Sequence, residues 1–123
     1  MVEDKRYAII LTHNRPELLR ECVEAISPQV DYILVMDNAS NPAVRWAHLS
    51  SPTGAGAEVL VIYVPDQPPN LSKLWNLGLD WISANKRIDE PEGDPYYVAF
   101  LCDDAIAPPG WYDAVTAAMR ETG

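Results

Sequence analysis

The sequence predicts an α/β protein, a single three-layer domain in which a mostly parallel sheet carries helices on both faces. Short apolar runs rich in Val, Ile and Leu alternate along the chain with stretches whose apolar residues recur at helical spacing. This alternation is typical of parallel sheets with right-handed crossovers. The sequence has no internal repeat that would indicate a second unit. We expect strands at residues 7–12, 31–36, 58–64 and 96–102.

Helices are expected between and after these strands. Asn14 can cap the first of them, Pro16 suits its first turn, and Glu17 follows Asn14 at the spacing of a capping box. Pro28 is expected to end this helix, because proline cannot continue it. Further helices are expected at 43–49, from about residue 71 to 82, and from about residue 109 to 120.

The composition excludes several classes of function. The net charge of −9 argues against a nucleic-acid or anionic-membrane surface, which would require clustered Lys and Arg. No apolar run approaches the ~20 residues that span a bilayer, and the charged start MVEDKR does not resemble a signal peptide. Cys22 and Cys102 are expected to be buried free thiols, with a disulfide as the alternative. These features predict a cytoplasmic protein.

Polar side chains gather where the predicted strands end. In a parallel sheet these carboxyl ends share one edge, and ligands bind there. Strand ends also meet solvent, so a purely structural explanation stands beside the functional one. The four clusters are Thr12-His13-Asn14-Arg15, Asp37-Asn38-Ala39-Ser40, Pro65-Asp66-Gln67 and Asp103-Asp104.

The last cluster, Asp103-Asp104, directly follows the apolar run YYVAFLC. No glycine-rich phosphate-binding motif follows any strand, which disfavours a dinucleotide fold and a P-loop. A diphosphate bound at this edge would therefore need another source of positive charge. Carboxylate oxygens are ligands of Mg²⁺ and Mn²⁺, and we expect one of these ions at the two aspartates.

Four stretches of the chain resemble the nucleotide-sugar-binding half of family 2 glycosyltransferases with the GT-A fold. Their order and spacing match the family, and together they span most of residues 1–123. The resemblance implies binding of a nucleotide-diphosphate sugar of the UDP or dTDP type, and glycosyl transfer to an unknown acceptor. The stretches are AIILTHNRPELLRECVEAI, ILVMDNAS, NLSKLWNLGLDW and YVAFLCDDAIAPPGW.

The resemblance also implies roles for individual residues. Thr12 and Asp37 occupy positions that grip the base, although Asp37 has an alternative role in capping its own turn with Asn38 and Ser40. Lys73 is placed either to reach a phosphate or to remain solvated. The full set of expected nucleotide contacts is Thr12, His13, Asn14, Arg15, Asp37, Asn38, Ser40, Asn70, Lys73 and Asp103.

The sequence departs from the family pattern in two ways. Cys102 stands where the first Asp of the metal motif is usual, which leaves Asp104 at the metal position and Asp103 either on the metal or on the ribose. The chain also stops at Gly123, before the acceptor-binding half that usually carries the catalytic base. Asp66 and Asp113 are candidates for this base, but no motif around them supports the role.

Three functions therefore remain open at the level of the sequence. One is a compact glycosyltransferase whose acceptor site is completed by a homo-oligomer or a partner chain. The second is a nucleotide-sugar-binding module without catalysis. The third is a degenerate GT-A-like domain that serves structure or protein contact, with Cys102 marking the loss of the metal site.

Overall fold

The computed structural model describes residues 5–44, 57–64, 71–85 and 96–122. The strands within these residues form a four-stranded sheet of order β3-β2-β1-β4, and every neighbouring pair is parallel. The predicted parallel α/β class is therefore confirmed, and the predicted bounds of the last two strands are those observed. The strands are β1 (Lys5–Thr12), β2 (Tyr32–Asn38), β3 (Glu58–Val64) and β4 (Tyr96–Cys102).

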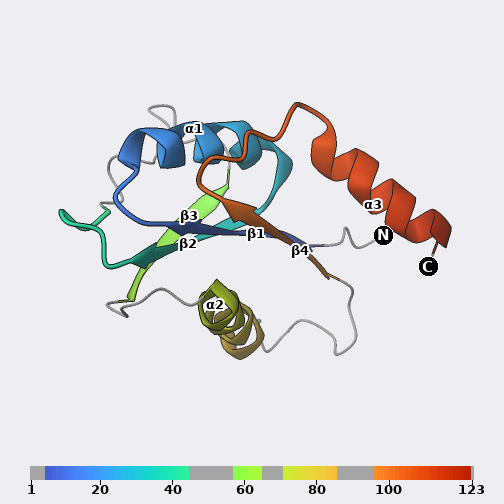
Figure 1. The fold of residues 1–123 in the computed structure, drawn as a ribbon. Helices are drawn as coiled ribbons and strands as arrows, with labels where there is room; N and C mark the ends of the chain where they lie inside the picture. The colour runs from blue at the N-terminus through green and yellow to red at the C-terminus, as the bar shows by residue number, and fades with distance from the viewer. Residues whose placement is uncertain (1–4, 45–56, 65–70, 86–95, 123) are drawn as a thin grey trace.

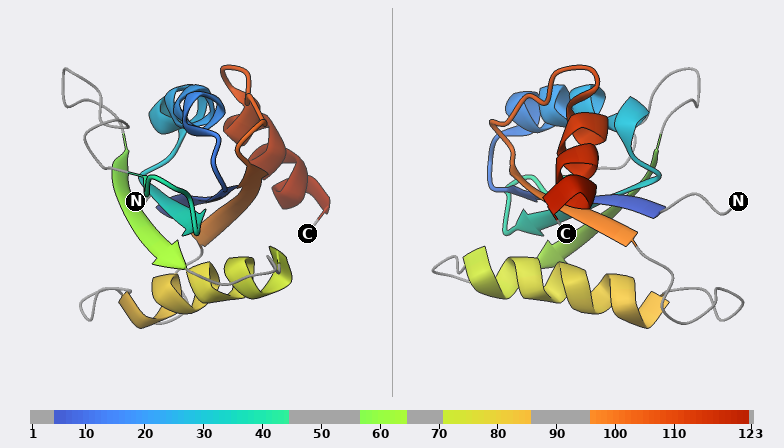
Figure 2. Two further views of the ribbon diagram at one scale, coloured as in Figure 1. Left: turned by 60° about the vertical axis from the view of Figure 1, so that its left-hand side comes forward. Right: turned by 90° about the vertical axis from the view of Figure 1, so that its right-hand side faces the viewer.

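Helices cover both faces of this sheet, as the sequence predicts. Helices α1 and α3 lie on one face, and α2 lies on the other (Figure 1), an arrangement that two further views confirm (Figure 2). Residues 43 and 44 are not helical, and the rest of the expected helix at 43–49 lies outside the described residues. The helices are α1 (Pro16–Ile26), the 3₁₀ helix η1 (Ser27–Gln29), α2 (Leu71–Asn85) and α3 (Trp111–Thr122).

The central strands are buried on both faces, because parallel strands alternate their side chains between two helical layers. Ala8 and Ile10 of β1 pack in the cluster under α1, while Ile9 and Leu11 pack in the cluster under α2. Helix α2 approaches β1 closely at Gly78, where an added Cβ would lie 2.9 Å from Ile9 Cδ1. A larger residue at this position would require the Ile9 side chain or the helix to shift.

Helix α1 begins differently from the sequence prediction. Pro16 opens it as expected, but Arg15 is the N-cap and no side chain caps the helix. The prediction that Asn14 caps α1 is therefore wrong. Asn14 adopts a left-handed backbone conformation with φ of 53°, and its side-chain amide bonds to neighbouring loop residues. The helix ends at Ile26, just before Pro28, as expected for a chain approaching proline.

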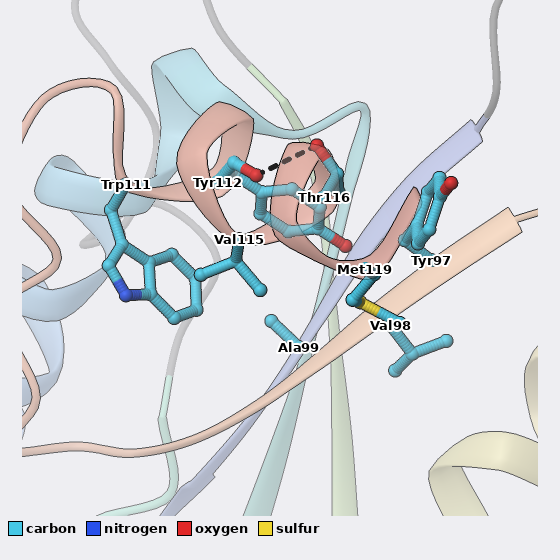
Figure 3. A pocket seen from close by; sticks show the side chains of 8 residues that line it. All are labelled: Tyr97, Val98, Ala99, Trp111, Tyr112, Val115, Thr116 and Met119. Carbon is cyan, nitrogen blue, oxygen red and sulfur yellow. Dashed lines mark hydrogen bonds between the residues drawn. The ribbon is translucent and has the colours of Figure 1, made fainter. Parts of the chain in front are cut away.

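A pocket of about 310 Å³ lies between β4 and α3 (Figure 3). Its walls are mostly apolar, and they come from the first half of the strand and the length of the helix. The lining residues are Tyr97, Val98, Ala99, Trp111, Tyr112, Val115, Thr116 and Met119.

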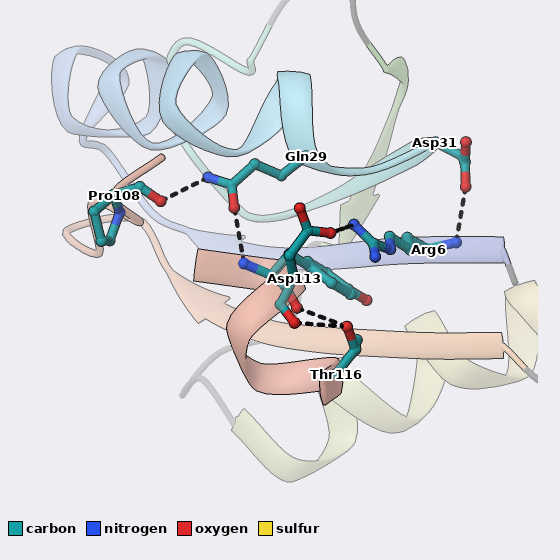
Figure 4. A network of polar contacts seen from close by, with 7 residues as sticks. Arg6, Gln29, Asp31, Pro108, Asp113 and Thr116 are labelled. Atoms are coloured by element: carbon teal, nitrogen blue, oxygen red, sulfur yellow. Dashed lines mark hydrogen bonds and ion pairs between the residues drawn. The ribbon is translucent and has the colours of Figure 1, made fainter. Parts of the chain in front are cut away.

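Helix α3 is fixed to the rest of the domain by a polar network around Gln29 (Figure 4). Gln29 Oε1 accepts a hydrogen bond from the backbone N–H of Tyr112 at 2.8 Å, and its Nε2 donates to the carbonyl oxygen of Pro108 at 3.0 Å. Arg6 of β1 forms an ion pair with Asp113 at 2.6 Å. The sequence gives no signal for this role of Gln29, since a lone glutamine after a helix is an ordinary surface residue.

Tyr112 also reaches from α3 into the sheet. Its hydroxyl donates to the carbonyl oxygen of Tyr7 at 3.0 Å, and its ring lies under the Arg6 guanidinium, 5.2 Å from the ring centroid. Burial raises the pKa of Tyr112 to about 12, although the positive charge of Arg6 opposes this rise. None of the described helices has both the length and the apolar character needed to cross a membrane.

Candidate functional site

The carboxyl ends of β1, β2 and β4 meet at one edge of the sheet. Thr12 at the end of β1 is aligned with Asp37 of β2, and Leu11 is aligned with Cys102 at the end of β4. The two aspartates after Cys102 consequently follow at the same edge. Three of the four predicted polar clusters thus come together as expected. The fourth, at residues 65–67, lies outside the described residues, as does Asn70.

The two adjacent aspartates have different environments. Asp103 is only 5% exposed, and its Oδ2 accepts a hydrogen bond from Thr12 Oγ1 at 3.0 Å. Its Oδ1 lies 3.5 Å from Arg15 Nη1, which supplies a partly exposed positive charge. A buried carboxylate needs such partners, because desolvation without them is costly. Asp104 is exposed, so it is the aspartate that a ligand from solvent can reach.

Asp37 is held within its own turn. It is 0% exposed, Oδ1 accepts from the backbone N–H of Ser40 at 3.1 Å, and Oδ2 accepts from that of Val44 at 2.9 Å. The turn includes Ala39, whose φ of 55° is unusual for a residue with a Cβ. Of the two roles considered for Asp37, turn capping is the one observed. A direct contact with a base stays a prediction, since both carboxylate oxygens accept hydrogen bonds within the turn.

The loops after β1 and β2 are joined by contacts between residues 13–14 and residues 38–41, which we call the loop junction. The backbone N–H of Asn14 donates to Ser40 Oγ at 2.9 Å, and Asn14 Oδ1 accepts from the backbone N–H of Asn41 at 2.7 Å. His13 Nδ1 contacts the carbonyl oxygen of Asn38, and its Nε2 lies 3.1 Å from Asn14 Nδ2. Several residues expected to contact a ligand therefore contact one another.

The pattern of these contacts assigns the hydrogens of the His13 ring. The Asn41 N–H can only donate, so the Asn14 oxygen must face it and the Asn14 NH₂ must face His13 Nε2. The ring nitrogen Nε2 is then the acceptor, and Nδ1 carries the hydrogen that it donates to the Asn38 carbonyl. No sequence motif predicts this arrangement, because it depends on two loops that are separated along the chain by a helix and a strand.

Exposure divides the predicted site residues into two groups. The buried members support the edge from within, and the exposed members form the surface that a ligand would meet. Lys73 is exposed on α2, across the sheet from α1. The buried group is Thr12, Asp37, Asn38, Ser40 and Asp103, and the exposed group around the edge is His13, Asn14, Arg15 and Asp104.

The described residues contain no group of three or more His, Cys, Asp or Glu side chains that could hold a metal ion. Asp103 is committed to Thr12 and Arg15, which leaves Asp104 as the exposed carboxylate. These donors do not fit a metal that the protein binds by itself. They do fit Mg²⁺ or Mn²⁺ held jointly by one carboxylate and the oxygens of a diphosphate, a common arrangement for hard cations.

The two cysteines lie on opposite sides of the sheet. Cys22 is buried beside Leu101 in the cluster under α1, and because side chains alternate along a strand, Cys102 points to the other face. Both thiols are free, but Cys102 is exposed, so the prediction that it is buried is wrong. The pKa of Cys22 is raised to about 12 by burial and, to a lesser degree, by the nearby charges of Asp103 and Asp104.

Comparison of the chain with protein-family models, curated proteins and solved structures gives no match.

Proposed function

We propose that the chain binds a nucleotide-diphosphate sugar, of the UDP or dTDP type, at the carboxyl edge of its sheet and together with Mn²⁺ or Mg²⁺. The observation that carries this proposal is the pairing of a buried Asp103, fixed by Thr12 and Arg15, with an exposed Asp104 at that edge. Ligands of parallel α/β sheets bind at such edges. The likeness of the sequence to family 2 glycosyltransferases supports the same ligand class.

In this proposal the two aspartates have separate tasks. Asp104 holds the metal from the protein side, while the buried Asp103 positions Thr12 and Arg15. The Arg15 side chain is 57% exposed and its contact with Asp103 is long, at 3.5 Å. Its guanidinium is therefore accessible to an anionic ligand from solvent.

When bound, the metal supplies positive charge that offsets the diphosphate and makes it a better leaving group. The chain itself has a formal charge of −9, so it carries no excess of positive charge to offset a diphosphate. Among the described residues at this edge, Arg15 carries a positive charge next to Asp103. We therefore expect affinity for a diphosphate to depend on the metal more strongly than affinity for the nucleoside does.

Glycosyl transfer to an acceptor would also require a general base. Asp113 is not suited to this role, because it pairs with Arg6 near the amino end of β1, at the opposite end of the strand from the site. Asp66 lies outside the described residues. We propose that the base and the acceptor contacts come from residues other than the described ones, supplied by a second copy or a partner chain.

A second candidate function is nucleotide-sugar binding without catalysis. The feature that favours it is that Asp113, the candidate base that lies among the described residues, pairs with Arg6 away from the site. The two functions differ in one measurable respect. Both predict nucleotide binding, but only the enzyme would hydrolyse or transfer the sugar of a nucleotide-diphosphate sugar.

Isothermal titration calorimetry with UDP, dTDP, ADP and GDP tests the proposed ligand class. Each nucleotide is titrated with Mn²⁺ present and again with a chelator. We expect UDP or dTDP to bind, and to bind more tightly with Mn²⁺. Asp104→Asn should abolish the metal dependence, whereas Asp80→Asn, which changes an exposed aspartate of α2, should leave it unchanged. Failure of all four nucleotides to bind would leave only the structural interpretation of the domain.

A further inference from the structure

The outer edge of β4 has an open backbone in the part of the chain that the structure describes. There β4 pairs with β1 on one side and with no strand on the other. Natural edge strands are usually protected by charged residues, proline or a bulge, since they can otherwise pair with another chain. The strand YYVAFLC contains no Lys, Arg, Asp, Glu or Pro. This edge is therefore competent to accept a further strand.

Apolar side chains are exposed on both sides of this edge. Phe100 of β4 lies on the sheet face that α2 covers, and its side chain is 42% exposed. Its ring packs edge-on against the ring of Trp75, with the two ring centroids 5.5 Å apart. Val115 and Met119 of α3 are exposed on the other face, four residues apart and so on one stripe of the helix. They line the pocket between α3 and β4 (Figure 3). The apolar surface therefore continues around the edge from one layer to the other.

We propose that this edge binds a second copy of the chain, with the two β4 strands antiparallel about a twofold axis that passes near Ala99. Such an axis, perpendicular to the sheet, joins the two sheets into one and keeps α3 of both copies on the same face. In this register Val98 of each copy lies opposite Phe100 of the other. Pairs of aromatic and β-branched residues across antiparallel strands are favourable.

One symmetry operation accounts for all three features of the edge. It pairs the open backbone, covers Phe100 on one face, and brings the Val115–Met119 stripes of the two α3 helices together on the other. An isologous contact of this kind needs a surface that complements itself, and most soluble oligomers form in this way. A partner of unrelated sequence would need one surface that fits Phe100 on one face of the sheet and another that fits the Val115–Met119 stripe on the other face.

Charge also favours a second copy over a basic partner. The chain has a net charge of −9, so two copies repel each other wherever their acidic surfaces meet. The strand at 96–102 carries no charged side chain, and it is thus a place where two acidic molecules can approach. A basic peptide, by contrast, would find no carboxylate along this strand to recognise.

This interface is independent of the proposed function. Because the strands would be antiparallel, the carboxyl ends of the two sheets point in opposite directions, and the two copies of Asp104 lie far apart. The dimer would then carry two separate sites, and neither copy would complete the other through this contact. Nucleotide binding and dimerisation can consequently succeed or fail separately.

Sedimentation velocity across a range of concentrations tests the interface with a matched pair of variants. Phe100→Lys places a charge on the β4 edge, and Leu60→Lys places the same charge on β3, the opposite edge strand, at a residue of similar exposure, 39%. We expect the wild-type chain and Leu60→Lys to dimerise equally. Phe100→Lys should weaken the dimer by at least about tenfold, equivalent to about 1.4 kcal/mol. Circular dichroism checks that both variants are folded.

A second variant locates the axis and does not depend on Phe100. Ala99→Cys in a Cys102→Ser background should form a disulfide-linked dimer on mild oxidation, because opposed residues of antiparallel strands have Cα atoms within disulfide range. Raising the salt concentration should strengthen the wild-type dimer by screening the repulsion between copies. A wild-type chain that remains monomeric at about 100 µM, a concentration at which Kd values in the micromolar range give dimers, would overturn the proposal. Dissociation by Leu60→Lys but not by Phe100→Lys would do the same.

Discussion

Thr12 and Asp103 are 91 residues apart in the chain, and a hydrogen bond of 3.0 Å joins their side chains at the carboxyl edge of the sheet. Both residues are buried, so this bond connects the ends of β1 and β4 beneath the surface that a ligand would meet. It also fixes the orientation of Asp103 relative to Asp104. The geometry of the proposed metal position therefore depends on a threonine that is only 4% exposed.

Removing this hydroxyl should destabilise the fold. Thr12→Val keeps the shape of the side chain but leaves a carboxylate oxygen of Asp103 without its donor, and we expect a loss of about 1–3 kcal/mol in the free energy of unfolding. Urea denaturation measures this change. The same substitution in an Asp103→Ala background should cost much less, because the two residues form a coupled pair. Equal costs in both backgrounds would show that the bond contributes nothing.

Asp37→Ala should affect stability before it affects binding. The substitution removes the acceptor of the Ser40 and Val44 backbone N–H groups, and hydrogen bonds to charged groups are worth about 1.5–3 kcal/mol. We expect a loss of this size in the free energy of unfolding, measured by urea denaturation. Calorimetry on the folded variant then tests the base contact. A variant of unchanged stability and much weaker UDP binding would make Asp37 a ligand contact and not a turn cap.

Metal binding should require the nucleotide. Asp104 alone supplies too few ligands to hold Mn²⁺, so titration of the free protein with Mn²⁺ should show no saturable site, whereas titration in the presence of UDP should show one. Electron paramagnetic resonance of unbound Mn²⁺ measures both. Cys102→Asp, which adds a carboxylate at an exposed position, should strengthen the response to the metal. Tight Mn²⁺ binding without nucleotide would contradict the shared-ligand arrangement.

The two cysteines should react at very different rates. Cys102 is exposed, while Cys22 is buried and has its pKa raised to about 12, so it is almost entirely protonated near neutral pH. We expect an alkylating reagent at pH 8 to modify Cys102 in the native protein and Cys22 only after denaturation. Mass spectrometry of tryptic peptides separates the two sites. Rapid labelling of Cys22 in the native protein would mean that α1 opens readily from the sheet.

Stability should fall in alkaline solution. Cys22 and Tyr112 both have a pKa of about 12 when folded, above their ordinary values of 9.0 and 10.0, so the folded state binds these protons more tightly than the unfolded state does. The stability that they contribute is complete below about pH 9 and is lost as the pH rises toward 12. Urea denaturation at intervals from pH 8 to about 11 measures the decline. Tyr112→Phe should reduce the slope of this decline above pH 10.

The fold was largely predictable because each strand contains an uninterrupted run of apolar residues. Residues 58–64 and 96–102 have the bounds expected from sequence, and the buried face of α1 follows the helical repeat of Leu19, Cys22, Val23 and Ile26. Burial on both faces of a parallel sheet leaves a signal in every residue of the strand. The convergence of Thr12, Asp37 and the two aspartates on one edge follows from the parallel topology alone.

The partners of each polar side chain were not predictable in the same way. Asn14 has the residue type and spacing of a helix cap, but a left-handed backbone turns it toward Asn41. Cys102 ends an apolar strand, yet it is exposed, because it is the last residue of an edge strand and lies on the face away from Cys22. Such outcomes depend on backbone angles and on loops that meet only after folding. A single sequence carries no pattern for them.

The loop junction has a thermodynamic consequence for whatever binds at this edge. Its hydrogen bonds at Asn14, Ser40 and Asn41 fix both loops in the free protein, so their conformational entropy is lost on folding and not on ligand association. A site prepared in this way loses little further freedom when it is occupied, which favours affinity for a small ligand. Affinity and fold stability then share one set of contacts. Substitutions that loosen the junction should lower both quantities together, even where the altered side chain never touches the ligand.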